Sequence, residues 1–346
     1  MAETYISMRQ FAKMAGVSPA TVSHVFSNPE SVAKDTVKHV LELAEHVGFS
    51  PNLVAKAALG EPTRSVGVLL SSLSDRYFGG IAAGMQAALI RAGYLPIFIA
   101  GTSAPEESQI RLLKHKVDAL VIGCSDEHLN IPSICMKQMA RMPVVVIEQL
   151  RPGLWCDSVL NDDFDGGLQA GRHLAELGHR RFGVCIYGES VSNSLFRLNG
   201  FRTAIEQSGG ELPEEFVTRL DFHCSEADAG RKLTEELIAI LRRPDAPTAF
   251  FAATDYLALR VYDAARALKL RIPQELSVVG FGDLQFSSYI SPALTTVRQD
   301  PETIGRKTAE LVLKRLQEPR RAIEEIRVPV QLIVQESTAK REGGKR

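Results

Sequence analysis

Apolar residues recur at helical spacing in three successive segments of the first fifty positions. Residues three or four apart fall on one face of a helix, so each segment predicts a short amphipathic helix. Three such helices can bury a shared core, which predicts an all-α domain over residues 1–50. The apolar stripes are Met8, Phe11, Ala12 and Ala15; Val22, Val25 and Phe26; and Val37, Val40, Leu41, Ala44 and Val47.

The residues between these stripes carry helix-end signals. Gly16 is expected to stop the first helix, because glycine enters a left-handed cap without steric cost, and Gly48 closes the third in the same way. Ser18 can cap the second helix through its hydroxyl, and Pro19 suits the first helical position, where no N–H is needed. This order predicts a helix-turn-helix, which places its second helix in a DNA major groove. A small helical subdomain that does not bind DNA is the alternative.

From Val66 onward, short apolar runs alternate with helical stretches. Continuous apolar runs indicate parallel strands that are covered on both faces. The length of residues 64–346 fits two doubly wound α/β lobes, and ligands bind such sheets at the carboxyl ends of the strands. The predicted strands are 66–71, 95–100, 119–123, 144–147, 182–187, 248–253 and 277–281, with helices over 80–92, 166–177 and 255–268.

Residues 51–63 differ from both parts. The run from Pro51 to Pro62 has a short helical pattern that is bounded by proline at each end. We therefore expect residues 51–63 to form a hinge helix and linker between the two domains.

Composition limits the classes of protein that remain. The chain has 346 residues, of which 45% are hydrophobic and 23% charged, as in an ordinary globular protein. No apolar run approaches the roughly 20 residues of a membrane span, and the N-terminus lacks the order of a secretory signal, so we expect a cytoplasmic protein. No phosphate loop, nucleophile elbow or metal-ligand motif occurs, so no enzyme, cofactor or metal is expected. The dispersed cysteines indicate reduced thiols rather than disulfides: Cys124, Cys135, Cys156, Cys185 and Cys224.

Charge is the observation that fits DNA binding least well. Residues 1–62 hold five basic residues and six acidic ones, a balance of −1, whereas a DNA-binding domain is usually basic. Helix N-termini, hydroxyls and backbone N–H groups can also hold phosphates. The balance therefore lowers the expected non-specific affinity more than it weakens the helix-turn-helix prediction.

An ordered set of short motifs resembles the lactose-repressor (LacI/GalR) family of bacterial transcription regulators. The set covers essentially the whole chain, although each motif is weak alone. The segments are Ala15–Ser18 with Thr21–Ser23, Gly48–Asn52, Val66–Leu69, Leu177–Arg181, Arg197–Arg202, Ser277–Asp283, Pro292–Gln299 and Glu336–Thr338.

The resemblance implies a homodimeric repressor that binds a near-palindromic operator. Its lobes would resemble periplasmic sugar-binding proteins, with a sugar or sugar acid between them and chain crossovers near Leu160 and Ser291. A dimer is expected rather than a tetramer, because the tail 339–346 has no leucine heptad. A solute-binding protein without a DNA role and a doubly wound enzyme are the competing interpretations.

The expected DNA contacts fall in three groups. Short side chains on the outer face of the second helix would approach base edges, others would hold phosphates, and the hinge would enter the minor groove. In that order they are Ser18, Pro19, Ala20, Thr21, Ser23 and His24; Ser7, Asn28 and Lys34; and Asn52, Ala55, Ala58 and Leu59.

Three positions depart from the family's DNA-binding pattern. Ala58 stands where the resemblance implies a minor-groove leucine, with Leu59 one residue later, so the hinge slips in register or kinks DNA less. His24 replaces the usual arginine. Ala33 replaces the usual serine cap of the third helix, unless Ser31 takes over that role.

Candidate effector residues follow the predicted strand ends or the family's positions. Each has a structural alternative: aromatic side chains can belong to the core, an arginine to an ion pair and an aspartate to a helix cap. The candidates are Ser72, Asp75, Tyr77, Phe78, Ser125, Glu148, Asp162, Arg197, Asp255 and Asp283.

Two departures concern the effector. Glu148-Gln149 replaces a common Asp-Arg pair, so contacts there must differ. Gly282 stands where many family members carry a ligand-binding aspartate, and the Gly280–Asp283 run resembles gluconate-type repressors. A lost carboxylate together with a retained Arg197 is compatible with a sugar-acid effector.

Overall fold

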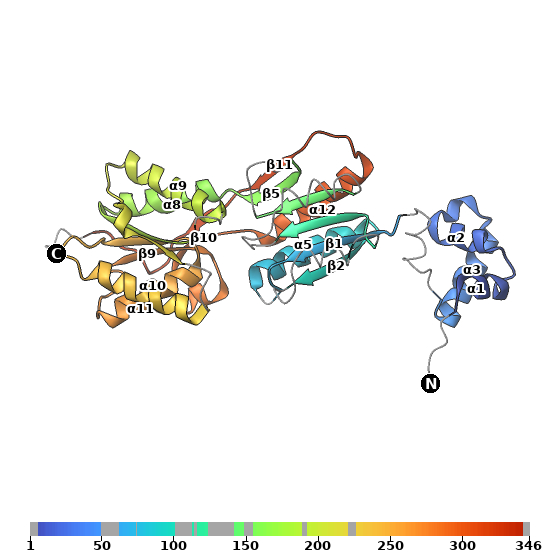
Figure 1. The fold of residues 1–346 in the computed structure, drawn as a ribbon, viewed down its shortest axis with the longest axis horizontal. Helices are drawn as coiled ribbons and strands as arrows, with labels where there is room; N and C mark the ends of the chain where they lie inside the picture. The colour runs from blue at the N-terminus through green and yellow to red at the C-terminus, as the bar shows by residue number, and fades with distance from the viewer. Residues whose placement is uncertain are drawn as a thin grey trace. The chain divides into compact units, whose positions relative to one another are not determined.

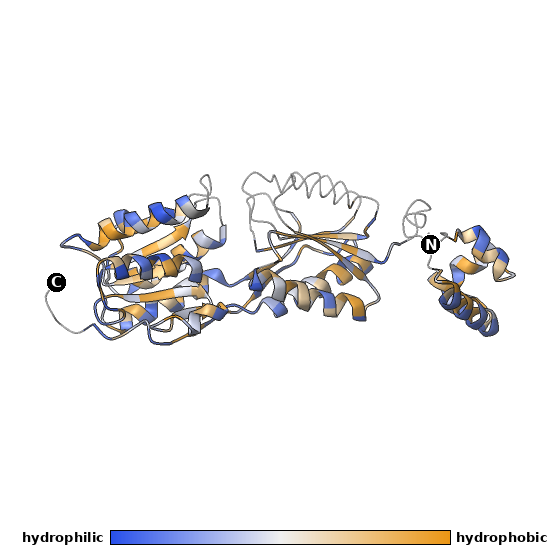
Figure 2. Ribbon diagram, turned by 90° about the horizontal axis from the view of Figure 1, so that it is seen from below, coloured by the Kyte–Doolittle hydropathy of each residue, from blue (hydrophilic) through white to orange (hydrophobic). Residues whose placement is uncertain are grey.

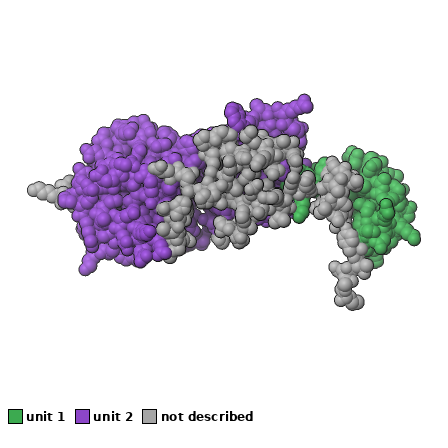
Figure 3. Space-filling view, in the orientation of Figure 1, with its two compact units in different colours: residues 1–64, 112–118 green, residues 65–111, 119–346 purple. Residues whose placement is uncertain are grey.

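The computed structural model describes residues 6–49, 62–73, 75–100, 113, 116–123, 142–148, 155–188, 192–220 and 226–341. The chain forms two compact units, which Figure 3 shows in different colours. The first comprises residues 1–64 with 112–118, and the second residues 65–111 with 119–346. Most of the expected hinge helix lies outside the described residues.

The first unit is a small helical domain. It contains α1 (Met8–Met14), α2 (Pro19–Ser27), the 3-10 turn η1 (Pro29–Ser31) and α3 (Lys34–Val47) (Figure 1). All three predicted stripes contribute to its core, in which Phe11 is fully buried and stacks on Phe49 with ring centroids 3.9 Å apart. Leu41 is the exception, because its side chain is exposed.

The helix-end signals act as expected. Gly16 and Gly48 have φ of +68° and +65°, and the Ser18 hydroxyl accepts the N–H of Thr21 at 3.0 Å. Helix α3 has no side-chain cap at Ala33. Ser31 does not take over, because its hydroxyl donates to the carbonyl of Asn28 at 2.7 Å.

The second unit contains two six-stranded sheets (Figure 1). The first sheet has the order β11-β5-β4-β3-β1-β2, and its strand pairs are all parallel. Helices α5 (Arg76–Arg91) and α12 (Pro301–Gln317) pack together beside it. We call this part the first lobe. Its strands are β1 (Ser65–Leu70), β2 (Leu95–Ala100), β3 (Ala119–Gly123), β4 (Val144–Ile147), β5 (Asp157–Asn161) and β11 (Glu325–Val328).

The second lobe is built on the order β12-β10-β9-β8-β6-β7, with only β12 antiparallel among the described strands. In Figure 1 its long helices lie in two layers, with the sheet between them. Orange, apolar residues are concentrated in the interior of the lobes (Figure 2). Its elements are α8 (Asp163–Glu176), β6 (Phe182–Tyr187), α9 (Ser192–Gln207), η2 (Glu214–Phe216), β7 (Val217–Leu220), α10 (Glu226–Leu241), β8 (Ala249–Ala252), α11 (Asp255–Ala267), β9 (Ser277–Gly282), η3 (Gln285–Ser288), β10 (Thr295–Arg298) and β12 (Gln331–Ile333).

The chain passes between the two lobes three times. The first crossing, at Asp162, adjoins the predicted Leu160. The second lies between β10 and α12, later than the predicted Ser291, because Leu294 is buried in the second lobe's core and β10 still belongs to its sheet. A third crossing, between β11 and β12, was not predicted.

Glycines let two helix pairs approach at backbone distance. A Cβ atom on Gly305 of α12 would overlap the carbonyl oxygen of Ile81 of α5. A Cβ on Gly200 of α9 would overlap the carbonyl oxygen of Phe164 of α8. Any larger residue must therefore push the helices apart.

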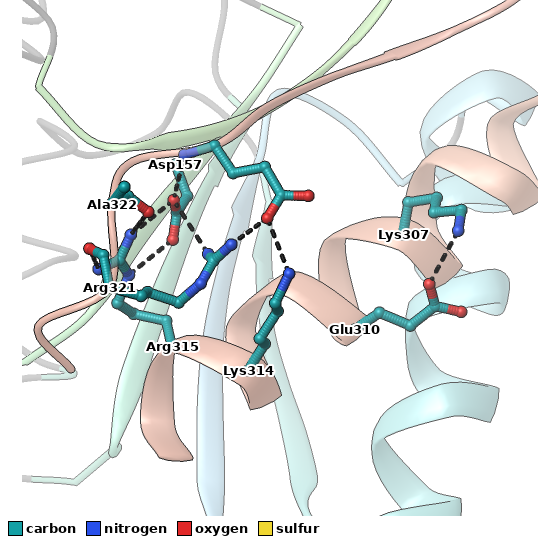
Figure 4. Close-up of polar contacts among 8 residues, drawn as sticks. Asp157, Lys307, Glu310, Lys314, Arg315, Arg321 and Ala322 are labelled. Atoms are coloured by element: carbon teal, nitrogen blue, oxygen red, sulfur yellow. Dashed lines mark hydrogen bonds and ion pairs between the residues drawn. The ribbon is translucent and has the colours of Figure 1, made fainter. Parts of the chain in front are cut away.

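A buried ion cluster fastens the edge of the first sheet (Figure 4). Asp157 is only 1% exposed. Its carboxylate accepts hydrogen bonds from Nε and Nη2 of Arg315, each at 2.8 Å. It also accepts the backbone N–H of Glu324 at 2.9 Å. Because Asp157 begins β5, Arg315 lies in α12 and Glu324 precedes β11, the cluster ties together three distant segments.

Candidate functional site

The exposed face of α2 carries most of the predicted base-contacting residues. Ser18, Pro19, Ala20 and His24 are exposed, and Thr21 and Ser23 are half-buried. Val22 and Val25 point into the core instead. The helix thus presents small side chains on one side, a shape that suits approach to base edges.

The other predicted DNA contacts differ in exposure and in the interactions that they already make. Asn28 and Lys34 are exposed. Ser7 caps α1, where its hydroxyl accepts the N–H of Gln10 at 3.4 Å. The predicted hinge contacts lie outside the described residues: Asn52, Ala55, Ala58 and Leu59.

A cavity of about 260 Å³ lies between the two lobes of the second unit. Its walls come from the carboxyl ends of strands in both sheets and from the loops and helices that follow them, as expected for doubly wound folds. The lining residues are Asp75, Tyr77, Phe78, Glu148, Tyr187, Asn193, Ser194, Arg197, Thr254, Tyr256, Phe281, Gly282, Leu284 and Gln299.

Five of these residues are aromatic, which gives the cavity flat apolar walls. Tyr77 and Phe78 contact each other edge to face, with ring centroids 5.5 Å apart. Both also pack on the core of the first lobe. Tyr77 and Phe78 therefore belong to the hydrophobic core and line the cavity at the same time.

Glu148 provides an acidic group on the first-lobe side. Its carboxylate accepts the hydroxyl of Tyr77 in a short hydrogen bond, and Nδ2 of Asn161 at 3.0 Å. Burial, reinforced by the nearby Asp163 carboxylate, raises the pKa of Glu148 to about 7. Near neutral pH this side chain can therefore either accept or donate a hydrogen bond.

Arg197 provides the cation on the second-lobe side, and it is only 4% exposed. Its Nε donates to Oδ1 of Asp163 at 2.7 Å, and Nη1 to the carbonyl of Ala253 at 2.6 Å. The guanidinium also lies 3.7 Å from the centroid of the Phe281 ring. Arg197 therefore forms an ion pair with Asp163, which was the structural alternative for this arginine, and the pair is buried. It does not remove Arg197 from the cavity wall.

Asp255 lies behind the cavity and not in its lining. It is fully buried, and its oxygens accept the hydroxyls of Ser287 and Thr296, each at 2.6 Å, and the N–H of Leu284 at 2.8 Å. Thr254, not Asp255, caps α11. We interpret Asp255 as the residue that holds the loop after β9 in place.

Four further predicted residues also lie outside the lining, or outside the described chain. The hydroxyl of Ser72 accepts the N–H of Asp75, and Asp162 caps α8. Asp283, whose φ is +51°, pairs with Arg298 at 2.5 Å and lines a neighbouring groove instead of the cavity. Ser125 is not among the described residues.

Sequence reasoning did not select several lining residues. Tyr187 and Thr254 stand at or directly after predicted strands, so the strand-end rule was sufficient to find them. Asn193, Ser194 and Tyr256 lie within helices, and Gln299 lies on a crossing that was predicted elsewhere.

The described residues provide no group of three or more metal-binding side chains. None of the described helices has both the length and the apolar character that a membrane crossing requires. Cys156 and Cys185 are buried free thiols, and the other three cysteines lie outside the described residues.

Comparison with known proteins gives matches over nearly the whole chain. "HTH-type transcriptional repressor PurR" from Escherichia coli (strain SE11) is 30% identical over 337 residues, which is 96% of this chain and 97% of that protein. The structure "transcriptional regulator CelR-cellobiose complex" has a TM-score of 0.71 at 28% identity, covering 96% of this chain and 99% of its own. A LacI family transcriptional regulator from Enterococcus faecium with bound ribose has a TM-score of 0.67 at 29% identity, covering 80% and 100%.

Two protein-family models match the chain, one within each compact unit. Residues 172–338 match "Periplasmic binding protein-like domain". Residues 7–52, which include the capped helices α1 and α2, match "Bacterial regulatory proteins, lacI family". The capped helix α2, the two-lobed α/β unit and the similarity to a repressor over 96% of the chain lead to one conclusion: the chain belongs to the lacI family of bacterial transcription regulators.

Proposed function

We propose that this regulator is a homodimeric repressor that acts in the cytoplasm on a near-palindromic operator. The exposed, small-residue face of α2 carries this proposal, because it suits direct approach to base edges. Two copies of such a helix read half-sites about one DNA turn apart. Pro19 and Ala20 cannot form bidentate base contacts, so apolar contact with a thymine methyl is their expected use.

We propose a small, uncharged sugar as the effector in the cavity. Aromatic walls stack on the apolar faces of a sugar ring, and Glu148 and Arg197 offer hydrogen bonds to its hydroxyls. The sequence alone also allowed a sugar acid. Its support weakens because the charge of Arg197 is already balanced by Asp163 at 2.7 Å, and Asp75 adds a further carboxylate to the lining.

Selection from random duplex DNA at fixed salt tests the repressor proposal. The full chain is expected to enrich one near-palindromic site, whose central step shows whether the Ala58-Leu59 hinge inserts. Absence of enrichment from folded, dimeric protein would favour either a regulator that needs a co-ligand to bind DNA or a solute-binding protein without a DNA role. A variant with Pro19 and Ala20 both replaced by aspartate should lose enrichment and keep its melting temperature, because both side chains are exposed.

Calorimetric titration tests the effector class with three probes: D-ribose, cellobiose and D-gluconate. A neutral sugar is expected to bind, and gluconate at least about tenfold more weakly than the better neutral sugar, because the described lining residues offer its carboxylate no unpaired cation. Tighter binding of gluconate than of either neutral sugar would show that the effector is a sugar acid and not an uncharged sugar. The proposal also requires the bound sugar to change operator affinity, since an effector must bind the two states differently.

A further inference from the structure

Two buried polar atoms at the cavity have no hydrogen-bond partner among the described residues. They are Oγ of Ser194 and Nε2 of Gln299, and both residues line the cavity. Ser194 is 1% exposed and lies in α9, one helical turn before Arg197. Gln299 lies on the second crossing between the lobes.

Unpaired polar atoms of this kind are rare, because an unsatisfied buried donor or acceptor costs about 1–3 kcal/mol. Ser194 lies in the first turn of α9, and its hydroxyl makes no hydrogen bond to the described residues of that helix. By contrast, Ser287 is similarly buried, and its hydroxyl donates to Asp255 at 2.6 Å. Within the described part of the chain, the Ser194 hydroxyl therefore has no structural hydrogen bond, although the backbone N–H of Ser194 donates to Oδ1 of Asn193 at 2.8 Å.

A third unpaired atom, Oδ1 of Asn161, has a different explanation. Asn161 lines a separate cavity of about 10 Å³, and its Nδ2 already donates to Tyr77 and Glu148. A space of that size holds about one water molecule. Ser194 and Gln299 face the much larger cavity, which is large enough for a small organic ligand.

We infer that Ser194 Oγ and Gln299 Nε2 are hydrogen-bonding contacts of the effector and set its specificity. The inference rests on the proposed sugar effector and names two residues that recognise it. The amide N–H of Gln299 requires an acceptor oxygen, whereas the hydroxyl of Ser194 can donate or accept. A ligand that satisfies both presents separate oxygen atoms to the second lobe and to the crossing segment, as a polyhydroxylated ring does.

Two variants of the full chain test this assignment, Ser194→Ala and Gln299→Met, with Ser287→Ala as the matched control. Ligand-free Ser194→Ala should melt at the wild-type temperature or above it, because no internal hydrogen bond is lost and alanine favours helices. Ser287→Ala should melt lower, because it removes the bond to Asp255. Gln299→Met should melt no lower than the wild type.

Effector affinity is the second measurement, made with whichever of D-ribose and cellobiose binds the wild type. Each of the two variants should raise Kd about tenfold, the effect of losing one hydrogen bond in a closed site. Wild-type Kd values in both would overturn the inference, as would a fall in the ligand-free melting temperature of Ser194→Ala equal to that of Ser287→Ala. If neither sugar binds the wild type, the proposed effector class fails, and the ligand-free melting temperatures alone then decide the role of Ser194.

Discussion

Replacing Arg197 with methionine should lower the free energy of unfolding by about 3–5 kcal/mol, the usual cost of leaving a buried charge without its partner. Asp163 would lose its Nε donor at 2.7 Å, and the Ala253 carbonyl its donor at 2.6 Å. For a chain of this size, the melting temperature should fall by roughly 10 °C. Sugar binding should be lost as well. Calorimetric unfolding and titration measure the two effects separately.

The double variant Arg197→Met with Asp163→Asn separates stability from binding. Burial already raises the pKa of Asp163, and Arg197 opposes that rise. The uncharged amide that replaces this carboxylate no longer needs a cation, so at least half of the lost stability should return. Sugar binding should not return, because the cavity still lacks the guanidinium. If the single variant Arg197→Met melts within about 2 °C of the wild type, Arg197 and Asp163 do not form a stabilising buried ion pair.

Replacing Gly200 with alanine should destabilise the second lobe by about 3 kcal/mol or more. The added Cβ would overlap the carbonyl oxygen of Phe164, a backbone atom that no rotamer change can move. Helices α8 and α9 would have to separate, and with them Asp163 and Arg197, which these helices carry. Sugar affinity should therefore fall together with the melting temperature.

Gly79→Ala is the matched control for this change. Gly79 lies in α5, and the nearest atom to an added Cβ is the carbonyl oxygen of Leu73 at 3.9 Å. Alanine should therefore be neutral there, or stabilise the helix by up to about 1 kcal/mol. Equal melting temperatures for the Gly200→Ala and Gly79→Ala variants would show that the α8–α9 contact tolerates separation.

The sequence predicted most of the fold because the central strands are uniformly apolar. The predicted strands 119–123, 144–147 and 182–187 agree with β3, β4 and β6 residue for residue. The unpredicted strands β5, β7, β10, β11 and β12 contain polar or charged residues. Such strands lack a continuous apolar run, and only pairing with distant neighbours fixes them in a sheet.

The candidate site was harder to predict, because neighbouring residues have different surroundings. Asp162 and Asp163 are adjacent, yet the first caps α8 while the second pairs with Arg197. Thr254 lines the cavity, whereas Asp255 beside it is enclosed by three hydrogen bonds. Only the three-dimensional packing of α9, α11 and the loop after β9 decides which member of each pair faces the ligand.

The three crossings also determine the order in which a growing chain can fold. Helix α12 and β11, which complete the first lobe, are encoded after the whole of β10 in the second lobe. Until residue 317 has left the ribosome, the apolar face of α5 at Ile81 and Met85 lacks α12, and Asp157 lacks Arg315; β11 follows only at residue 328. The lobe that begins first therefore finishes almost last, and a premature stop near the C-terminus would expose the core of the lobe that was made earliest.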